Sequence, residues 1–429
     1  MIFHIYSALL YVFSIFFFPY MAVKMAVMGK SRAGLRQRFG LFDRGFFYAR
    51  GEKTVWVHAV SVGETLAAVP LVKALKDRRP GLQVYFSTVT ETGNAVAKQN
   101  LGDAAKVFFF PFDFPFSVKR TVGLARPDVF IVVETEIWPN LIRTLASGGV
   151  PALMVNGRIS PRSFKGYMRA RFFMRRVLSL MAHLNMQTAA DAERIKALGA
   201  PAERVSVVGN VKFDQACRPA GEAGRDIFTK AKLGIPEGSV VMLAGSTHTG
   251  EEAEVLEAYR KLLESYSDAF LIIAPRHPER LDEVKSLVER SGYKYRLRSS
   301  LRGEKLAGPG IVILDTMGEL AALYRVGDIN FVGGSLVQVG GHNVLEPVAF
   351  GRPVFFGPHM HNFAEIAGIL KDRGVGIEVR DGHELAREAV RLISEPERLE
   401  SLGRAAKETL LKNRGALDRN IDLIERFLG

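Results

Sequence analysis

NFVGGSLVQVGGHNVLEPVAFGRPVFFG, residues 330–357, predicts a strand, a glycine-rich turn and the start of a helix. Asn343 followed three residues later by Glu346 matches a capping box, and Pro347 lies early enough in a helix to cost little hydrogen bonding. A strand that leads through glycines to a helix N-terminus offers free N–H groups and the positive end of a dipole to an anion. The stretch therefore predicts a phosphate site. On the pattern alone, a tight turn with Glu346 serving only as a cap is an equal alternative.

Apolar runs alternate with helical patterns along the rest of the chain, which predicts parallel α/β sheets. A segment rich in turn-forming residues, 209–226, separates two such sets and reads as a linker. With 429 residues the chain is too long for one core. We therefore expect an α/β protein with two doubly wound domains that face each other across a cleft. The expected strands are residues 54–60, 82–89, 106–110, 128–133, 151–155, 184–187 and 204–208, then 239–244, 270–274, 311–314, 328–332, 353–356 and 375–379.

The chain begins with an apolar segment, residues 5–23, that has no charged residue and is about long enough to cross a bilayer. The positive charge follows this segment, whereas a cleavable signal carries it in front, so we expect an uncleaved anchor. Seven basic residues and one acid follow, and the positive-inside rule then places the body in the cytoplasm. A helix lying on the membrane surface is the alternative, which Pro19 keeps open. The basic residues are Lys24, Lys30, Arg32, Arg36, Arg38, Arg44 and Arg50.

A second basic tract, residues 137–190, contains no Asp or Glu, and with the first tract it accounts for the net charge of +13. Nucleic acid is disfavoured as its partner because no recognition motif accompanies it. An anionic membrane, or a phosphorylated lipid within it, is the better target. A solvated helix face is less favoured because the usual interspersed acids are missing. The basic residues are Arg143, Arg158, Arg162, Lys165, Arg169, Arg171, Arg175 and Arg176.

Familiar cofactor signatures are missing from the sequence. Gly29-Lys30-Ser31 imitates the end of a P-loop without the required glycine five positions earlier, and no G-x-G-x-x-G follows the first strand of either half. Cys217 is the one cysteine, so no disulfide framework exists and a reducing compartment is expected. Five histidines match no common zinc spacing, which predicts hydrogen bonding rather than metal ligation. They are His248, His277, His342, His359 and His361.

Acidic residues follow two predicted strands of the first half, where ligands of open α/β sheets bind. Glu64, in HAVSVGE, is a candidate general base. A first-turn Glu favoured by the helix dipole is the alternative, and the dipole would lower its pKa. Glu134 and Glu136, in VVETEIWPN, are hard to explain by packing, and at least one should face the cleft. Lys212, in the linker, is also expected beyond the carboxyl ends of the strands. Taken alone, it is interpreted as a solvated lysine.

Polar residues also follow the predicted strands of the second half of the chain. GSTHTGEE, residues 245–252, is a strand-to-helix turn, and PRHPER, residues 275–280, places Arg276 directly after a strand. The planar guanidinium of arginine suits phosphate or carboxylate. Met317-Gly318-Glu319 opens a further helix.

Seven segments together resemble a known family, namely HAVSVGET, VVETEIWPN, GNVKFD, AGSTH, APRHPER, TMGEL and GGHNVLEP. Their order, behind an N-terminal apolar segment, resembles the bacterial 3-deoxy-D-manno-octulosonic acid (Kdo) transferases, and the match spans nearly the whole chain. The resemblance implies a GT-B glycosyltransferase built from two Rossmann-like domains. It implies transfer of Kdo from CMP-Kdo to the tetraacyldisaccharide lipid A precursor, lipid IVA, in lipopolysaccharide biosynthesis. It also implies attachment to the inner membrane with the body on the cytoplasmic face.

The resemblance also assigns site residues and domains. The family's proton acceptor falls on Glu64, and its two transition-state-stabilising positions fall on Glu134 and Lys212. Among the donor contacts, Gly340 to Asn343 are expected to face the CMP phosphate and Glu346 to meet the ribose hydroxyls. If Glu346 is used by its own helix cap, Glu319 is the alternative ribose contact. The expected domains are a membrane anchor over residues 1–28, an acceptor domain over 29–215, and a donor domain with C-terminal helices over 216–429. One of these C-terminal helices could cross back to the first domain. The CMP-contacting motifs fall on Pro275, Arg276, Met317, Gly318, Glu319, Asn343, Val344, Leu345 and Glu346.

The chemistry of the reaction agrees with these assignments. A sugar hydroxyl needs a base, and the phosphate charge of departing CMP is stabilised by a helix N-terminus and cationic side chains. Single displacement with inversion needs no covalent intermediate, and we expect no metal and no cofactor beyond the donor. Two alternatives stay open. One is a GT-B transferase or epimerase that uses a UDP-sugar, and the other is a membrane-tethered nucleotide-sugar-binding protein without turnover.

Overall fold

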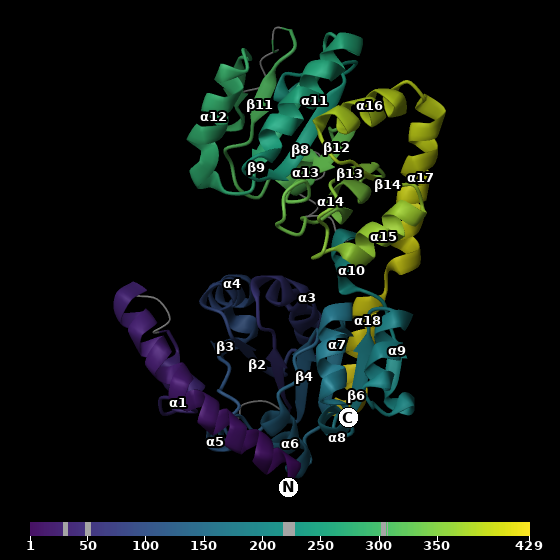
Figure 1. Ribbon diagram of the computed structural model, residues 1–429. Helices are drawn as coiled ribbons and strands as arrows, with labels where there is room; N and C mark the ends of the chain where they lie inside the picture. The colour runs from purple at the N-terminus through teal and green to yellow at the C-terminus, as the bar shows by residue number, and fades with distance from the viewer. Residues whose placement is uncertain (29–32, 48–52, 218–227, 302–305, 307) are drawn as a thin grey trace. The chain divides into compact units, whose positions relative to one another are not determined.

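The computed structural model describes residues 1–28, 33–47, 53–217, 228–301, 306 and 308–429 (Figure 1). The chain forms two compact units, the first from Met1–Val211 and Arg414–Gly429 and the second from Lys212–Asn413. Each unit contains a seven-stranded parallel sheet with helices on its faces. The predicted α/β class with two doubly wound sheets is confirmed.

The first sheet has the strand order β3-β2-β1-β4-β5-β6-β7. Its order reverses between β1 and β4, and the crevice beyond the carboxyl ends of two such strands is where ligands bind in this class of sheet. Val55 of β1 pairs with Val129 of β4, and both strands are buried on both faces. The strands are β1 Thr54–His58, β2 Gln83–Thr88, β3 Lys106–Phe109, β4 Val129–Val133, β5 Ala152–Gly157, β6 His183–Met186 and β7 Val205–Val207.

The helices of the first unit include one from the end of the chain. Helix α18 packs against α3 and lies among the first unit's helices (Figure 1). Ile421 and Ile424 are fully buried in the first core, and Asn420 accepts a hydrogen bond of 3.0 Å from Asn185. The helices are α1 Ile2–Met28, α2 Leu35–Arg38, α3 Val62–Arg78, α4 Glu91–Leu101, α5 Pro115–Ala125, α6 Pro139–Ser147, α7 Pro161–Arg169, α8 Arg171–Leu178, α9 Ala189–Ala197 and α18 Ala416–Leu428.

The second sheet has the order β10-β11-β9-β8-β12-β13-β14, which reverses between β8 and β12. Its strands are β8 Val241–Thr247, β9 Phe270–Pro275, β10 Tyr295–Leu297, β11 Ile311–Ile313, β12 Ile329–Val332, β13 Val354–Phe356 and β14 Gly376–Glu378. Its helices are α11 Glu251–Ser265, α12 Leu281–Arg290, α13 Leu320–Leu323, α14 Leu345–Val348, α15 Ala364–Asp372, α16 Gly382–Ile393 and α17 Pro396–Asn413. Helix α10, Val211–Cys217, begins at the boundary between the units.

The structure corrects the predicted division of the chain. The second unit begins at Lys212 rather than at residue 216, and α18 belongs to the first unit because its apolar face completes the first core. The predicted linker begins with helix α10, while residues 218–226 of that linker lie outside the described residues. Strand β10 was not predicted because it has only three residues, and its central Arg296 is exposed between half-buried Tyr295 and Leu297.

Helix α1 is apolar over Ile2–Met21, with a mean hydropathy of 1.8, and is long enough to cross a membrane. One face of it nevertheless packs on the first unit (Figure 1). Tyr6 donates a hydrogen bond of 3.1 Å to Asp113, and the ring of Phe18 lies 5.6 Å from that of Phe112. Of the basic residues predicted to follow this helix, Lys30, Arg32 and Arg50 lie outside the described residues, as do Gly29 and Ser31.

Candidate active site

Glu64 lies in the first turn of α3, directly beyond the carboxyl end of β1. Its Oε2 accepts a hydrogen bond of 2.6 Å from the backbone N–H of Val60, and its Oε1 accepts one of 3.1 Å from the hydroxyl of Ser61. Ser61 is the N-cap and accepts in turn from the Glu64 backbone N–H. The reciprocal contacts form a capping box that fixes the direction of the carboxylate.

The pKa of Glu64 is raised above its ordinary value of 4.5, chiefly because the carboxylate is buried. The negative charge of Glu134 raises it further, while the hydrogen bonds from Val60 and Ser61 lower it. The expectation that the helix dipole would depress this pKa is therefore wrong, because desolvation outweighs the field of the helix N-terminus. A higher pKa makes Glu64 a stronger base at neutral pH.

Glu134 follows β4, on the other side of the crevice, and its backbone has a φ of 60°. A non-glycine residue in this left-handed region carries strain of about 1–3 kcal/mol. The turn after β4 contains Glu134 and Glu136, and both lie close enough to Glu64 for their charges to interact. Burial raises the pKa of Glu136 to about 7, and the charges of Glu64 and Glu134 add to that increase. The structure thus brings Glu64 and Glu134 together, with Glu136 as a third carboxyl group that the prediction did not select.

A buried amide network at the ends of β5 and β6 fixes the start of α10. The Asn156 side-chain oxygen accepts a hydrogen bond of 3.2 Å from Val211 N–H, and its backbone oxygen accepts one of 2.9 Å from Gln187. Asn210 donates to Gln187 at 2.8 Å. Lys212 is therefore on a positioned helix rather than in a linker. Its ammonium nitrogen lies 4.3 Å from the centre of the Phe363 ring within the second unit.

The second unit has a hollow of about 200 Å³ at the carboxyl ends of its strands. Pro275 and Arg276 line it from the end of β9, and Met317 and Gly318 line it from the turn after β11. Four of the predicted donor contacts therefore surround one cavity. Ser246, at the end of β8, also lines it and has a φ of 57°. The lining also includes Thr316 and the carboxylate of Asp315, which accepts a hydrogen bond of 2.9 Å from Ser299 N–H. The apolar walls and the guanidinium suit a flat ring that carries an anionic substituent.

The glycine-rich turn after β12 is held by Glu251, the first residue of α11. This fully buried carboxylate accepts hydrogen bonds from the backbone N–H groups of Gly334, Ser335 and Leu336 at 2.7–2.9 Å, and from that of His248 at 2.9 Å. Its two oxygens thus join the turns that follow β8 and β12, the two strands at which the sheet order reverses. Glu251 positions the strand ends on which the predicted donor contacts lie.

The predicted capping box at Asn343 and Glu346 is wrong. Helix α14 has four residues and begins at Leu345, and its N-cap, Val344, makes no side-chain cap bond. The Asn343 side chain accepts from Leu345 N–H at 3.2 Å and donates to the Glu346 carboxylate at 3.2 Å. So short a helix has little dipole, and an anion here must rely on side chains and individual N–H groups. Val344 and Leu345 are fully buried, so they can reach a ligand only through their backbone.

Because Glu346 does not cap α14, its carboxylate is available for another role. Its burial raises its pKa to about 7, whereas the Asn343 hydrogen bond and the nearby positive charge of Arg276 lower it. The structure therefore brings Glu346 near Arg276. Glu319, the alternative ribose contact, is instead paired with Arg298 at 3.3 Å and accepts a hydrogen bond from the Thr316 hydroxyl.

Two of the histidines meet in the second unit, as the hydrogen-bonding prediction expected. His248 Nε2 and His342 Nε2 are 2.8 Å apart, and the ring centroids of His248 and His277 lie 5.4 Å apart in an edge-to-face arrangement. Burial, followed by the charges of His248 and Arg276, lowers the pKa of His342 to about 4. Among the residues that the structure describes, no group of three or more His, Cys, Asp or Glu side chains is arranged to hold a metal ion.

Comparisons with known proteins agree with this geometry. The family model described as 3-deoxy-D-manno-octulosonic-acid transferase matches residues 33–215. The Kdo transferase of Haemophilus influenzae is 36% identical over 92% of this chain and 92% of its own length, and that of Bordetella pertussis is 34% identical over 87% of each. The chain belongs to the Kdo transferase family. A glycosyltransferase structure from Rickettsia africae, 14% identical, superposes with a TM-score of 0.58 over 89% of this chain and 99% of its own, and the fold is GT-B.

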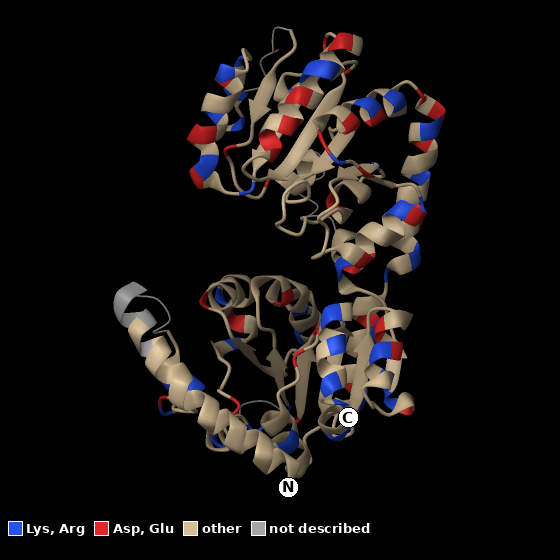
Figure 2. Cartoon of the chain, in the orientation of Figure 1, with Lys and Arg blue, Asp and Glu red and all other residues tan. Residues whose placement is uncertain are grey.

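In this Kdo transferase family member, α7 and α8 of the first unit carry most of the basic tract, while Arg143 is on α6 and Arg158 precedes α7 (Figure 2). Arg171, Arg175 and Arg176 line a hollow of about 840 Å³. No acid lines this hollow among the residues that the structure describes, and exposed Phe172 lies at its edge. Cationic side chains beside an exposed aromatic ring suit a phosphorylated lipid at a membrane surface.

Replacing Glu251 by Gln should lower the free energy of unfolding of the second unit by about 3 kcal/mol, because an amide nitrogen would face backbone donors in a buried site. Glu254→Gln is the matched control on the same helix, since Glu254 accepts one backbone hydrogen bond, from Gly382. Urea unfolding followed by hydrogen exchange of residues 333–341 measures both variants. Equal losses in the two variants would contradict the special role of Glu251.

Proposed function

We propose that the protein is an inverting glycosyltransferase that moves Kdo from CMP-Kdo to lipid IVA on the cytoplasmic face of the inner membrane. Family membership over 92% of the chain supports Kdo transfer. The observation that carries the mechanism is the pairing of Glu64 and Glu134 across the crevice between β1 and β4, with the pKa of Glu64 raised by burial.

Glu64 takes the proton of the acceptor hydroxyl as that oxygen attacks the anomeric carbon of Kdo. The bond between this carbon and the CMP phosphate oxygen breaks, and CMP leaves with the bonding electrons. Glu134 stabilises the positive charge that develops on the sugar, and Lys212 stabilises the negative charge on the departing phosphate. A single displacement of this kind inverts the anomeric centre, and we expect it to proceed equally well in EDTA.

The second unit holds the donor. The hollow bounded by Pro275, Met317 and Gly318 takes the cytosine ring, and Arg276 with the turn before Asn343 takes the phosphate. Glu346 takes the ribose hydroxyls, which its release from helix capping permits. CMP should therefore compete with the donor, whereas UDP should not. That outcome would separate this function from a transferase or epimerase that uses a UDP-sugar.

We further propose that α1 lies in the plane of the membrane surface. Its contacts with the first unit extend from Phe3, whose ring meets that of Phe173, to Phe18. That stretch is about 22 Å long, most of the roughly 30 Å thickness of the hydrocarbon core. A spanning helix would have to draw Asp113 into the hydrocarbon, where a polar group costs several kcal/mol.

The outward face of α1 supports the same orientation. Leu9, Val12, Phe13 and Phe16 are 56–75% exposed on this face, which has no charge. Ser7, on the other face, is buried and donates to Asn140 at 3.1 Å. A helix with one docked face and one exposed apolar face suits insertion at the level of the lipid head groups.

Glu64→Gln should reduce Kdo transfer by at least about 100-fold and leave CMP binding unchanged, because it removes only the base. Glu91→Gln is the matched control, since Glu91 is an exposed first-turn glutamate on the next helix. Mass spectrometry of lipid IVA incubated with CMP-Kdo measures transfer, and calorimetry measures CMP binding. Undiminished transfer by Glu64→Gln would refute the assignment of the base.

The pH profile of kcat/KM should fall on the acid side at a pH above 4.5, the ordinary pKa of glutamate, because burial raises the pKa of Glu64 and the base works only when deprotonated. Activity is present above the raised pKa and is lost as the pH drops through it. Glu346→Gln should retain this acid limb, since Glu346 contacts only the donor. An acid limb at or below pH 4.5 would be inconsistent with a buried base.

Reversing the charges of Arg169 and Arg171 should raise the KM for lipid IVA by at least about tenfold, because each reversal removes an attraction to lipid phosphate and adds a repulsion. The KM for CMP-Kdo should not change. Arg290→Glu, in the second unit, controls for the altered net charge of the protein. Steady-state kinetics at fixed ionic strength are the measurement, and an unchanged acceptor KM would remove the basic tract from acceptor binding.

Nitroxide labels at Leu9→Cys and Phe16→Cys, in a Cys217→Ser background, should report equal membrane depths. The two positions lie on one face, seven residues or about 10 Å apart along the helix. A helix in the membrane plane places both at one level, whereas a spanning helix separates them by about that distance. Power-saturation EPR in vesicles measures the depths, and a difference near 10 Å would establish a spanning helix.

A further inference from the structure

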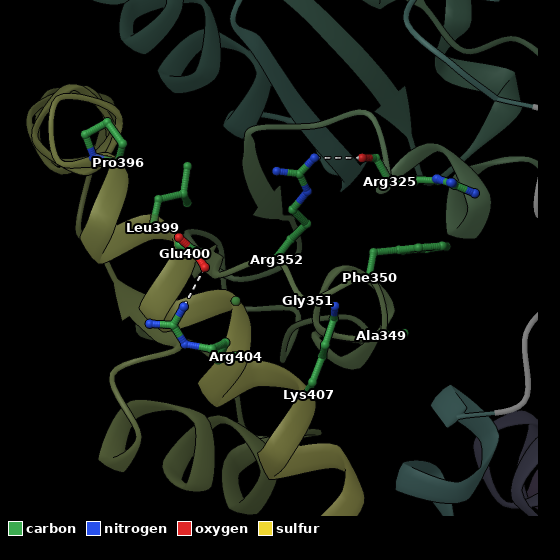
Figure 3. Close-up of a pocket in the computed structure, with 11 residues that line it drawn as sticks. Arg325, Ala349, Phe350, Gly351, Arg352, Pro396, Leu399, Glu400, Arg404 and Lys407 are labelled. Atoms are coloured by element: carbon green, nitrogen blue, oxygen red, sulfur yellow. Dashed lines mark hydrogen bonds and ion pairs between the residues drawn. The ribbon is translucent and has the colours of Figure 1, made fainter.

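A second large hollow lies in the second unit, and its volume is about 680 Å³ (Figure 3). Arg325 and Arg352 line it from the segments that lead into β12 and β13. The predicted donor contacts follow the carboxyl ends of their strands, so this hollow is at the opposite edge of the same sheet. Nothing in the proposed transfer reaction uses it.

The lining of the hollow carries four cationic side chains and one acid, Glu400. One wall is a face of α17, on which Glu400, Arg404 and Lys407 follow one another at helical spacing. Arg404 is paired with Glu400 at 2.5 Å, and Arg352 donates to the backbone oxygen of Arg325 at 3.2 Å (Figure 3). Arg352 also lies 3.7 Å from Asp328, a carboxylate that it shares with Lys230. The four cationic side chains of the hollow thus meet two carboxylates, one of them shared with a further lysine, and an excess of positive charge remains.

Lys407 makes no hydrogen bond or ion pair with any residue that the structure describes. Its aliphatic chain lies over the turn at Gly351, where an added Cβ would come within 2.8 Å of Lys407 Cε. Gly351 has a φ of 68°, and a Cβ on Gly403 would lie 2.8 Å from the Gly351 oxygen. Two glycines thus let the turn and α17 approach closely and hold the ammonium group at the hollow.

We propose that this hollow binds a ligand with a phosphomonoester or diphosphate group. Its volume falls within the roughly 300–1,000 Å³ of small-molecule sites, and the excess of positive charge requires an anion. Guanidinium groups bind the oxygens of a phosphate in pairs, while the ammonium of Lys407 supplies a point charge. The ring of Phe350, at the same edge, offers an apolar surface to the rest of the ligand (Figure 3). The proposal does not depend on the identity of the sugar that the enzyme transfers.

Titration of the full chain in detergent with inorganic pyrophosphate tests the site, with calorimetry as the readout. Arg352→Gln and Lys407→Gln should each weaken binding by at least about tenfold, the usual effect of removing a charged hydrogen-bond partner. Arg398→Gln is the matched control, because it removes an equal charge from the opposite face of α17 and should change nothing. Unchanged thermal unfolding of Lys407→Gln would show that its fold is intact.

Hydrogen exchange in the presence of pyrophosphate should protect residues 349–352 and 396–407. Two further ligands distinguish the source of the phosphate. Tighter binding of dihexanoyl phosphatidic acid than of glycerol 3-phosphate assigns the site to a membrane lipid, and equal binding assigns it to a soluble metabolite. The absence of saturable pyrophosphate binding would overturn the proposal, as would equal weakening by Arg398→Gln and Lys407→Gln.

Discussion

The second unit, which carries the predicted donor contacts, depends on one buried carboxylate, that of Glu251. An ionised carboxylate without water costs several kcal/mol unless hydrogen bonds replace its hydration, and four backbone N–H groups do so here. These donors come from the two turns that border the reversal of strand order, so one side chain sets the spacing of both. The turn after β12 can fold back because Gly334 has a φ of 68°, and a Cβ there would lie 2.9 Å from the ring of His342. His342 thereby reaches His248, and Asn343, a predicted donor contact, follows directly.

In the first unit, the turns at the strand ends depend on backbone strain rather than on one buried carboxylate. Glu134 and Asn156, at the ends of adjacent strands β4 and β5, both have a positive φ, which turns the chain sharply where each strand ends. The hydrogen bond from Glu134 N–H to Val155 and the bonds around Asn156 stabilise these turns. The two strained turns direct side chains to different partners: Glu134 is brought close to Glu64, and the buried Asn156 side chain accepts from Val211 N–H at the start of α10.

Much of this architecture could be predicted because buried parallel strands have continuous apolar runs that stand out in a sequence. Thirteen of the fourteen strands found among the described residues were predicted, whereas the three-residue strand β10 was missed. The grouping of α18 with the first unit depends on which core its apolar face completes, and sequence spacing does not contain that information. The motifs also predict Pro275, Arg276, Met317 and Gly318 as donor contacts, and these four residues line one cavity. The role of Glu251 could not be predicted from the sequence, in which it is one acid in a strand-to-helix turn. Its hydrogen-bond donors lie up to 85 residues away in the chain.

Local sequence patterns gave wrong predictions for two glutamates near helix N-termini, where burial and the helix terminus have opposite effects on the pKa. Glu64 has the capping contacts that its spacing predicts, yet its pKa rises, because removing a carboxylate from water costs more than the helix N-terminus returns. Glu346 has capping-box spacing without the capping box, and its pKa reaches about 7. These two carboxyl groups then suit different tasks. In the proposed mechanism, the raised pKa of Glu64 increases its basicity toward a hydroxyl. If the donor binds beside Glu346 as proposed, its negative charge would raise the pKa of Glu346 further, favour the protonated form and so remove a repulsion. A neutral carboxyl group can still hydrogen-bond to ribose, so the burial that opposes ionisation at Glu346 would favour binding of a negatively charged donor.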